Sequence, residues 1–275
     1  MTATTRDAVN QTVSTPWVSA VLTSPQARSF GTYVFSFFTL FLLWHIMATY
    51  IFPSVLFSPP LAVFKKAVEL TASGVLLTDI AVSMKRILLG FAIGSALGFP
   101  IGLLMGNVRF FRRLFEPYTE FFRFIPAIAL LTLAVIWFGI GETSKVFLIV
   151  YATIFIVVLN TMAGVISVPG NKIRAAQCLG ATRTQIFFLV SLPATVPFIL
   201  TGMRIAMGNA FMTMVSAEML GANAGIGQMM WTARLYMQVD DLFVGLLVLG
   251  LLGFATDRVF RFLISRFADK YAPAL

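Results

Sequence analysis

Three ionisable residues interrupt long apolar stretches of this chain, and they are its first candidates for chemistry: Arg123, Arg204 and Glu218. A charge within such a stretch is costly and generally faces protein or a water-filled path. Arg204 lies near the middle of its stretch and can attract an anion, or it can be held by a buried partner such as a backbone carbonyl. Arg123 has Glu120 and Glu116 on the same side of a helix, which favours a structural ion pair. Glu218 lies near the end of its apolar stretch. It can contact a solute, or it can shape the adjacent outer loop.

The remaining reactive residue types do not combine into a catalytic or metal site. His45 is the only histidine and Cys178 the only cysteine, so neither a nucleophile with its base nor an internal disulfide can be assembled. The run GIGETSK at 139–145 contains glycines and a lysine but lacks the Gly-Lys-Ser/Thr ending of a phosphate-binding loop. We therefore expect a chain that is not an enzyme, binds no metal and has no cofactor of its own.

The composition is that of a chain surrounded mostly by lipid. Of its 275 residues 59% are hydrophobic and 11% charged, whereas a soluble domain has about 25% charged residues. The formal net charge of +9 raises the possibility of nucleic-acid binding. The basic residues instead occupy short polar gaps between apolar runs, as the positive-inside rule requires. The composition therefore favours a membrane protein without a nucleic-acid partner.

About six segments are long and apolar enough to cross a membrane. They are expected at about residues 31–52, 86–106, 119–140, 145–167, 194–217 and 241–264. The N-terminal residues 1–30 are expected to form a mobile cytosolic arm, and residues 267–275 a cytosolic tail. Residues 53–78 are expected to contain a short helix on the membrane surface, with Leu61, Phe64 and Val68 on one face. The predicted fold is all-α, with a core over residues 79–266.

The distribution of Lys and Arg predicts the orientation. With the N-terminus inside, twelve of the 20 basic residues lie on the cytosolic side, six lie outside, and Arg123 and Arg204 lie within spans. Both termini are therefore expected in the cytosol, as in a multi-pass protein of the bacterial cytoplasmic (inner) membrane.

Glycines recur every four residues along the second predicted span, at Gly90, Gly94, Gly98, Gly102 and Gly106. Small residues at this spacing share one helix face and let a second backbone approach closely. Two interpretations follow: a tightly packed seam, or a helix interface that slides during transport. Both predict that a bulky residue at Gly98 disrupts assembly.

The polar segment between the fourth and fifth spans has the most specific pattern in the chain. It reads NKIRAAQCLGATRTQIFFLVSLP at 171–193. We expect a helix, a break at Gly180, and a second helix from about Thr182 that ends at Pro193. Pro197 is expected to bend the start of the fifth span. Ala175 and Ala176 present a small surface that another protein can approach.

This segment resembles the EAA motif of permease subunits of binding-protein-dependent ABC importers. The small pair is Ala175-Ala176, the glycine is Gly180, and the motif closes at Leu192-Pro193, with Arg174 in place of the leading Glu. The form IRAAQCLGA at 173–181, with WFGIGETSK at 137–145 and AEMLGANAGIG at 217–227, is similar to the nitrate, taurine and aliphatic sulfonate branch. The resemblance covers about residues 55–265.

The resemblance implies a type I ABC importer permease (MetI-like) core with a cytosolic coupling helix at about 171–188. It implies that Arg174, Ala175, Ala176, Gly180, Ala181, Leu192 and Pro193 couple this chain to a cytosolic ATPase, two copies of which bind ATP and Mg. It also implies a second permease copy and an extracytoplasmic binding protein that releases substrate against the outer loops. The expected substrate is a small anion or zwitterion such as taurine, an alkanesulfonate, nitrate or bicarbonate. Arg204, Arg123 and Glu218 are the candidates for the translocation path.

The main alternative is a secondary transporter or channel that works alone. Such a protein needs ion-coupling residues at mid-depth. The acidic Glu120 and Asp257 lie near span ends, and a lone transporter has no use for a docking segment.

Overall fold

The computed structural model describes residues 25–51, 56–219 and 221–267. Every regular element in these residues is helical, which confirms the all-α prediction. Most of the predicted arm (1–30) and of the predicted tail (267–275) lies outside the described residues. The chain divides into two compact units, residues 1–61 and 62–275, and each is described by itself.

The first unit contains one apolar helix. Helix α2 (Pro25–Ile46) continues into a π-helical turn, η1 (Met47–Ile51). Large side chains such as Phe35, Phe38 and Tyr50 are exposed along it. An exposed row of this kind suits a helix that faces lipid, in the region expected for the first span.

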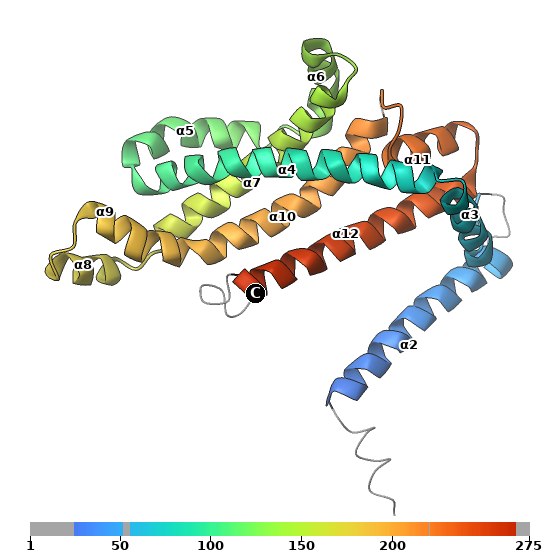
Figure 1. The fold of residues 1–275 in the computed structure, drawn as a ribbon, viewed down its shortest axis with the longest axis horizontal. Helices are drawn as coiled ribbons and strands as arrows, with labels where there is room; N and C mark the ends of the chain where they lie inside the picture. Colours follow the sequence, from blue (N-terminus) through green and yellow to red (C-terminus); the bar gives the residue numbers. More distant parts are fainter. Residues whose placement is uncertain (1–24, 52–55, 220, 268–275) are drawn as a thin grey trace, which may run out of the picture. The chain divides into compact units, whose positions relative to one another are not determined.

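The second unit is a set of helices joined by short connections (Figure 1). The elements, in chain order, are α3 (Pro60–Ala72), α4 (Val75–Asn107), α5 (Arg109–Phe122), η2 (Ala127–Leu130), α6 (Leu131–Phe138), α7 (Glu142–Ile166), α8 (Gly170–Cys178), α9 (Arg183–Ile186), η3 (Phe187–Ser191), α10 (Leu192–Met219), α11 (Ile226–Leu235) and α12 (Val239–Phe267). Helices α8 and α9 lie at one end of this unit and α11 lies at the other (Figure 1).

Four helical segments are long and apolar enough to cross a membrane: Val75–Asn107, Glu142–Ile166, Arg183–Met219 and Val239–Arg266. A fifth is obtained if Arg109–Phe122 and Ala127–Phe138 form one broken span, bent by 85°. The described residues thus contain four or five of the expected spans, with Phe35–Ile51 as a shorter apolar helix.

Two predicted spans differ from their observed helices. The second starts at Val75, eleven residues before its predicted start at 86, because the polar Asp79, Ser83 and Arg86 are buried inside the protein. The third is not one continuous helix. It breaks at residues 123–126, just before and at Pro126, which has no backbone N–H to continue a helix.

The glycine ladder packs α4 against α7 over its whole length. A Cβ added at Gly90, Gly98 or Gly106 would lie 2.6, 3.0 and 2.5 Å from the Cβ of Ile149, Val157 and Val165. The residue numbers on α4 and on α7 increase in the same direction along the contact, so the two helices run parallel. The facing residues are β-branched and hold fixed rotamers, so the contact is a close, stiff seam.

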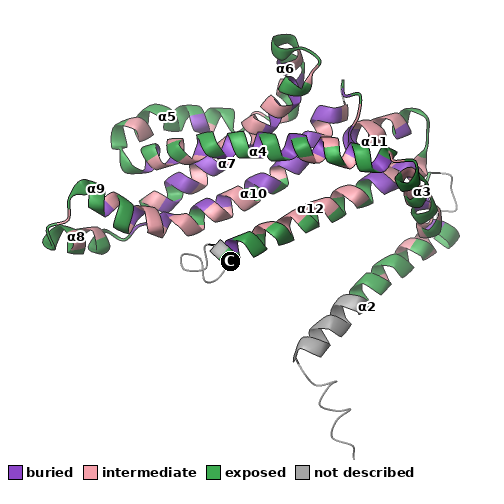
Figure 2. Cartoon of the chain, in the orientation of Figure 1, coloured by how far each residue is buried: buried purple, intermediate pink, exposed green. Residues whose placement is uncertain are grey.

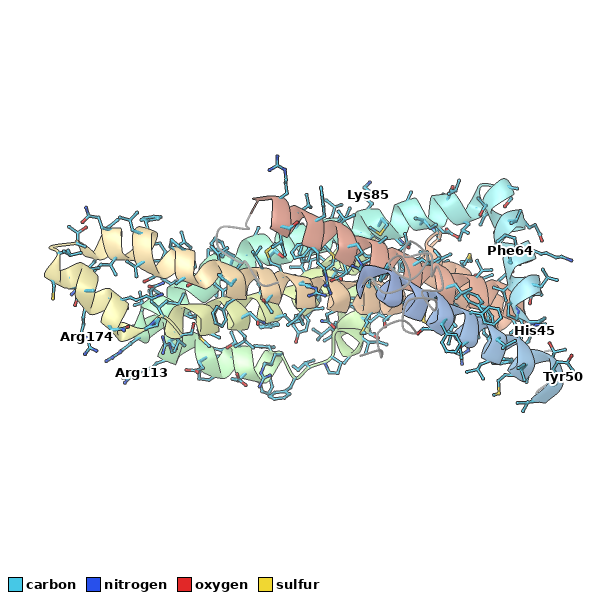
Figure 3. All side chains as sticks on the ribbon, turned by 90° about the horizontal axis from the view of Figure 1, so that it is seen from below. His45, Tyr50, Phe64, Lys85, Arg113 and Arg174 are labelled. Atoms are coloured by element: carbon cyan, nitrogen blue, oxygen red, sulfur yellow. The ribbon has the colours of Figure 1, made fainter. Side chains whose placement is uncertain are left out.

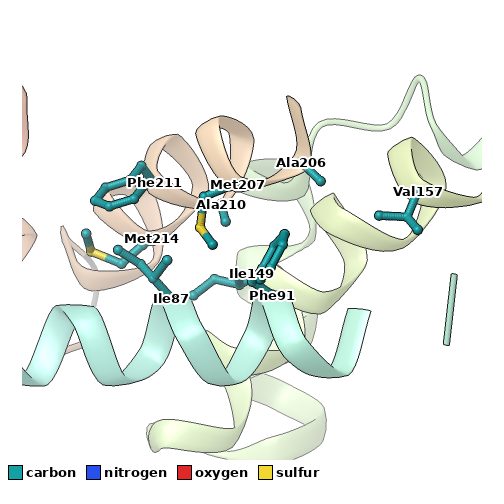
Figure 4. Close-up of a cluster of buried hydrophobic side chains, with 9 residues drawn as sticks. All are labelled: Ile87, Phe91, Ile149, Val157, Ala206, Met207, Ala210, Phe211 and Met214. Atoms are coloured by element: carbon teal, nitrogen blue, oxygen red, sulfur yellow. The ribbon is translucent and has the colours of Figure 1, made fainter. Parts of the chain in front are cut away.

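Helix α10 packs on α7 in the opposite direction. Here Gly164 lies under Phe198, and Gly202 lies under Asn160. Nine buried apolar side chains fill the space where α4, α7 and α10 meet: Ile87, Phe91, Ile149, Val157, Ala206, Met207, Ala210, Phe211 and Met214 (Figure 4). Buried residues are concentrated on these three helices, whereas α5, α8 and α9 are mainly exposed (Figure 2).

Helix α3 has the apolar face expected of a surface helix. Leu61, Phe64 and Val68 are all exposed on it. The carboxylate of Glu69 accepts a hydrogen bond of 3.0 Å from Lys66 Nζ and raises the pKa of that lysine.

Two basic side chains lie close to the α8–α9 end of the second unit. They are Arg113 of α5 and Arg174 of α8 (Figure 3).

Candidate functional site

The segment that joins α7 to α10 folds as a helix, a tight reversal and a second helix, as predicted. Helix α8 ends in a left-handed Gly180 at φ 77°. The amide of Ala181 donates to the Ala176 carbonyl at 3.0 Å, and that of Gly180 donates to Gln177 at 2.9 Å. This pair of bonds is a Schellman motif, which satisfies carbonyls at the helix end and favours glycine at the left-handed position.

The second helix of the segment begins at once with a capping box. The Thr182 hydroxyl accepts from the Gln185 amide, and the Gln185 side chain accepts from the Thr182 amide. Local hydrogen bonds thus satisfy both ends of the reversal.

The expectation that Pro193 ends the second helix is wrong. Helix α9 passes through the π-helical turn η3 into α10, so helical structure is continuous from Arg183 to Met219. Pro193 is the second residue of α10. A widened π-turn just before it changes the hydrogen-bond partners, so the missing N–H of proline is accommodated without a break.

The residues of this segment face outward. Helix α8 has no buried residue, Arg174, Ala175 and Gly180 are exposed, and Leu179 at the tip is 88% exposed. A helix that buries nothing in its own chain gains little stability from packing. Leu179 and the small side chain of Ala175 are therefore accessible from outside the chain.

Arg204 of α10 is held by a partner on another helix. Its Nε and Nη2 bond the two carboxylate oxygens of Asp257 at 2.6 and 3.2 Å, and Arg261 adds a bond of 3.0 Å to Asp257. The sequence suggested a buried partner such as a backbone carbonyl. The partner in the structure is a carboxylate of α12. A two-bonded Arg–carboxylate pair is directional and leaves the arginine charge compensated.

A cavity of about 810 Å³ opens beside the break in the third span. Its lining includes Arg123 and Pro126 at the break, Tyr151 and Asn160 of α7, and Asn209 of α10. Tyr151 donates at 2.6 Å to the Phe122 carbonyl, which also accepts from the Ile125 amide at 3.0 Å where α5 ends. Irregular backbone at this depth is tolerated where it is buried in protein or lines a cavity.

Arg123 at the rim of this cavity pairs with Glu120 at 2.6 Å and lies over the Phe124 ring at 4.3 Å. The predicted Glu120 pair is therefore present, yet the Arg123 side chain stays 39% exposed. Arg204 and Glu218 are not among the residues that line the cavity.

Glu218 belongs instead to a buried polar cluster at the end opposite α8 and α9. Its carboxylate accepts from Arg86 Nη1 at 2.6 Å, from the Ser83 hydroxyl at 2.9 Å and from the Gly227 amide at 2.9 Å. Arg86 is one of the six basic residues that the orientation predicted from the sequence places outside, and no other role was expected of it. Asp79, Ser83 and Arg86 recur at helical spacing on one face of α4, and this spacing is the signal that could have revealed the cluster.

Among the described residues no group of three His, Cys, Asp or Glu side chains can hold a metal ion. The described residues present three other features: the exposed segment, the cavity and the buried cluster.

Comparison with known proteins assigns the chain to a family. Residues 98–269 match the family model of the binding-protein-dependent transport system inner membrane component. A probable ABC transporter permease protein of Brucella melitensis is 44% identical over 206 residues, which cover 75% of this chain and 84% of that protein. The taurine transport system permease protein of Escherichia coli is 36% identical over 248 residues, covering 88% and 90%.

Other relatives named for aliphatic sulfonates and nitrate are 35% and 32% identical. The fold is similar to that of a methionine ABC transporter in an inward-facing conformation, with a TM-score of 0.59, 18% identity, and coverage of 70% of this chain and 97% of that one. These matches agree with the resemblance carried by residues 171–193. The chain belongs to the family of binding-protein-dependent ABC importer permeases, whose members span the inner membrane and are not themselves enzymes.

Proposed function

We propose that this chain moves a small anion or zwitterion inward by alternating access, driven by ATP hydrolysis in a partner subunit. The observation that carries the proposal is the exposed α8–α9 segment joined to α10 by continuous helical structure from Arg183 to Met219. The relatives named for taurine, aliphatic sulfonates and nitrate support a substrate of this class. Bicarbonate is a further candidate of similar size and charge.

The α8–α9 segment is the contact with the ATPase in this proposal. Leu179 enters a recess on the partner, and the small Ala175 and Ala176 allow its surface to approach. Thirty-seven helical residues follow from Arg183, a length of about 55 Å at 1.5 Å per residue. Movement of the ATPase pair on binding ATP therefore tilts α10 as a lever, without a hinge at Pro193.

The cavity beside the broken span is the proposed substrate path. Discontinuous helices in transporters commonly form binding sites near mid-depth. Arg123 supplies positive charge, and Asn160, Asn209 and Ser216 supply polar groups in a mainly apolar lining. Such a lining holds a small anion weakly enough for release. Arg204 is given a supporting role, because it is not among the residues that line the cavity and the two oxygens of Asp257 hold its guanidinium.

The complete transporter in this proposal contains two permease copies, two ATPase subunits with ATP and Mg, and a binding protein outside. Both termini of this chain and the α8–α9 segment are cytosolic. The end with the Glu218 cluster is then the outer end, where residues 141–145 and 222–228 receive the binding protein.

The first experiment measures ATP hydrolysis by the complex that co-purifies with this chain, comparing wild type with Gly180→Trp. Gly74→Trp is the matched control: Gly74 and Gly180 have φ of 79° and 77°, and an added Cβ meets nothing within 4 Å at either. The proposal expects Gly180→Trp to lose the ATPase or its stimulation by the binding protein, and Gly74→Trp to keep both. If no ATPase co-purifies and the chain alone moves solute in liposomes, the chain is a stand-alone transporter.

The substrate path is tested by uptake in vesicles. Arg123→Gln should lower uptake of an anion by about tenfold or more, the loss of one charge-assisted contact. Arg204→Ala that assembles normally and transports at the wild-type rate removes Arg204 from the path.

A further inference from the structure

The proposed transport steps give no role to the two buried charged side chains, Arg86 and Glu218, at the end opposite α8 and α9. Arg86 and Glu218 are 3% and 0% exposed, and Ser83 is 0% exposed. Charged side chains are almost never fully buried unless they are paired. Replacing such a pair by apolar residues often leaves a protein as stable. Stability alone therefore does not account for this buried pair.

The guanidinium of Arg86 divides its hydrogen bonds between two separate outer segments. Nε and Nη2 bond the two carboxylate oxygens of Glu142, the first residue of α7, at 2.6 and 2.5 Å. Nη1 bonds Glu218 of α10 at 2.6 Å and the Ala224 carbonyl of the α10–α11 loop at 2.8 Å. The rigid fork of arginine allows this double engagement, which the single ammonium of lysine cannot reproduce.

The α10–α11 loop is folded around the Glu218 carboxylate. The amides of Gly225, Ile226 and Gly227 donate to Asp79 at 2.7 Å, Ser83 at 2.9 Å and Glu218 at 2.9 Å. A Cβ at Gly225 would lie 2.5 Å from the Glu218 carboxyl carbon. Side chains of α4 and α10 thus cap the start of α11, so the loop is fixed by tertiary contacts.

The Glu142 arm differs from the Glu218 arm in exposure. The Glu142 side chain is 65% exposed, whereas Glu218 is enclosed. Lys145, one turn into α7, is 4% exposed and donates to the Gly141 carbonyl at 3.0 Å, which tethers the turn before α7. Arg86 is the described side chain that bonds both the start of α7 and the α10–α11 loop.

We propose that Arg86 is a positioning residue that joins the start of α7 to the α10–α11 loop, so that the two segments move as one rigid surface during transport. The inference rests on the proposed function, because this surface is the one assigned to receive the binding protein. A surface held together in this way gives the binding protein one docking geometry in each state of the transporter.

The test is hydrogen exchange of the assembled transporter, read by mass spectrometry, with and without ATP. In the Glu142→Gln variant, we expect the amides of Gly225–Gly227 to exchange at least about tenfold faster than in wild type, although these amides donate to side chains other than that of Glu142. In Glu218→Gln, exchange at residues 142–146 should rise reciprocally. Stimulation of ATP hydrolysis by the binding protein should fall by about fivefold in both variants.

Glu69→Gln is the matched control, since Glu69 is also an ion-paired carboxylate with a side chain 68% exposed. It should leave exchange at both segments at the wild-type rate. Unchanged exchange at Gly225–Gly227 in Glu142→Gln overturns the inference. So does a wild-type transporter in which adding ATP changes the exchange of one segment and not that of the other. Exchange is read on the permease itself, so these outcomes are separate from loss of the ATPase, which would overturn the proposed function instead.

Discussion

The two ends of the long helices achieve order in opposite ways. At the α8–α9 end, the reversal is completed by hydrogen bonds between near neighbours, from Ala181 to Ala176 and between Thr182 and Gln185. At the other end, the loop after α10 is held by Asp79 and Ser83, more than 140 residues away in the sequence. The first end is ordered by its own local hydrogen bonds and leaves Leu179 exposed, whereas the second end buries Arg86 and Glu218.

The difference shows how one helical unit can combine an exposed segment suited to binding a partner with a rigid buried cluster at its other end. A locally stabilised reversal can move as a unit and present Leu179 without losing its shape. The cluster at the other end, with Arg86 of α4 paired to Glu218 of α10, resists rearrangement, because breaking this pair leaves an unpaired charge buried in the protein. The glycine ladder and α10 connect the two ends.

The largest effect should come from removing one charge at the buried end. Arg86→Met leaves Glu218 buried without its cation, at an expected cost of about 3–5 kcal/mol. Thermal unfolding of the permease, purified in mild detergent without the ATPase, measures the loss. Arg174→Met at the exposed end is the control and should leave the unfolding temperature nearly unchanged. Equal losses in the two variants would erase the contrast between the ends.

The second-largest loss of stability should come from a change in the glycine seam between α4 and α7, which connects the two ends. Gly98→Leu forces a side chain into a site where even a Cβ lies 2.9 Å from the Ile154 carbonyl, and overpacking of this kind costs about 1–3 kcal/mol. Gly253→Leu on α12, where an added Cβ meets nothing within 4 Å, is the control. Size-exclusion chromatography and thermal unfolding should show poor assembly in Gly98→Leu alone. A normal Gly98→Leu protein would mean that α4 and α7 separate freely.

A smaller effect is expected from backbone strain at the exposed end. Gly180→Ala places a Cβ in the left-handed region, at a cost of about 1–2 kcal/mol. No neighbour is displaced, so we expect faster exchange at Gly180 and Ala181 with unchanged exchange at Gly225–Gly227. A change at the buried end would show that the two ends are less independent than their hydrogen bonds indicate.

The smallest effect should follow loss of the helix cap. Thr182→Ala removes one half of the capping box and costs about 1 kcal/mol. Exchange at residues 183–186 should accelerate several-fold, while Thr182→Ser, which keeps the hydroxyl, should match wild type. If Thr182→Ala also matches wild type, the cap is held by more than its own side chain.

Features encoded by neighbouring residues were predictable from the sequence alone. The reversal at Gly180 followed from a glycine after a helical run and Thr182 before the next, because these residues satisfy helix ends locally. The glycine ladder followed from a four-residue spacing on one helix. The apolar spans followed from composition, because lipid requires long uncharged stretches.

Features that depend on distant partners were decided by the tertiary structure. The sequence placed Arg204 within a span, and only the fold brings Asp257 of α12 to its guanidinium. The early start of α4 was hidden because its polar residues turn inward to the α10–α11 loop. Pro193 was expected to end a helix, and the π-turn before it lets the helix continue. A local sequence pattern indicates the backbone conformation that its residues favour. The partner of a buried charge is set only when distant helices pack together.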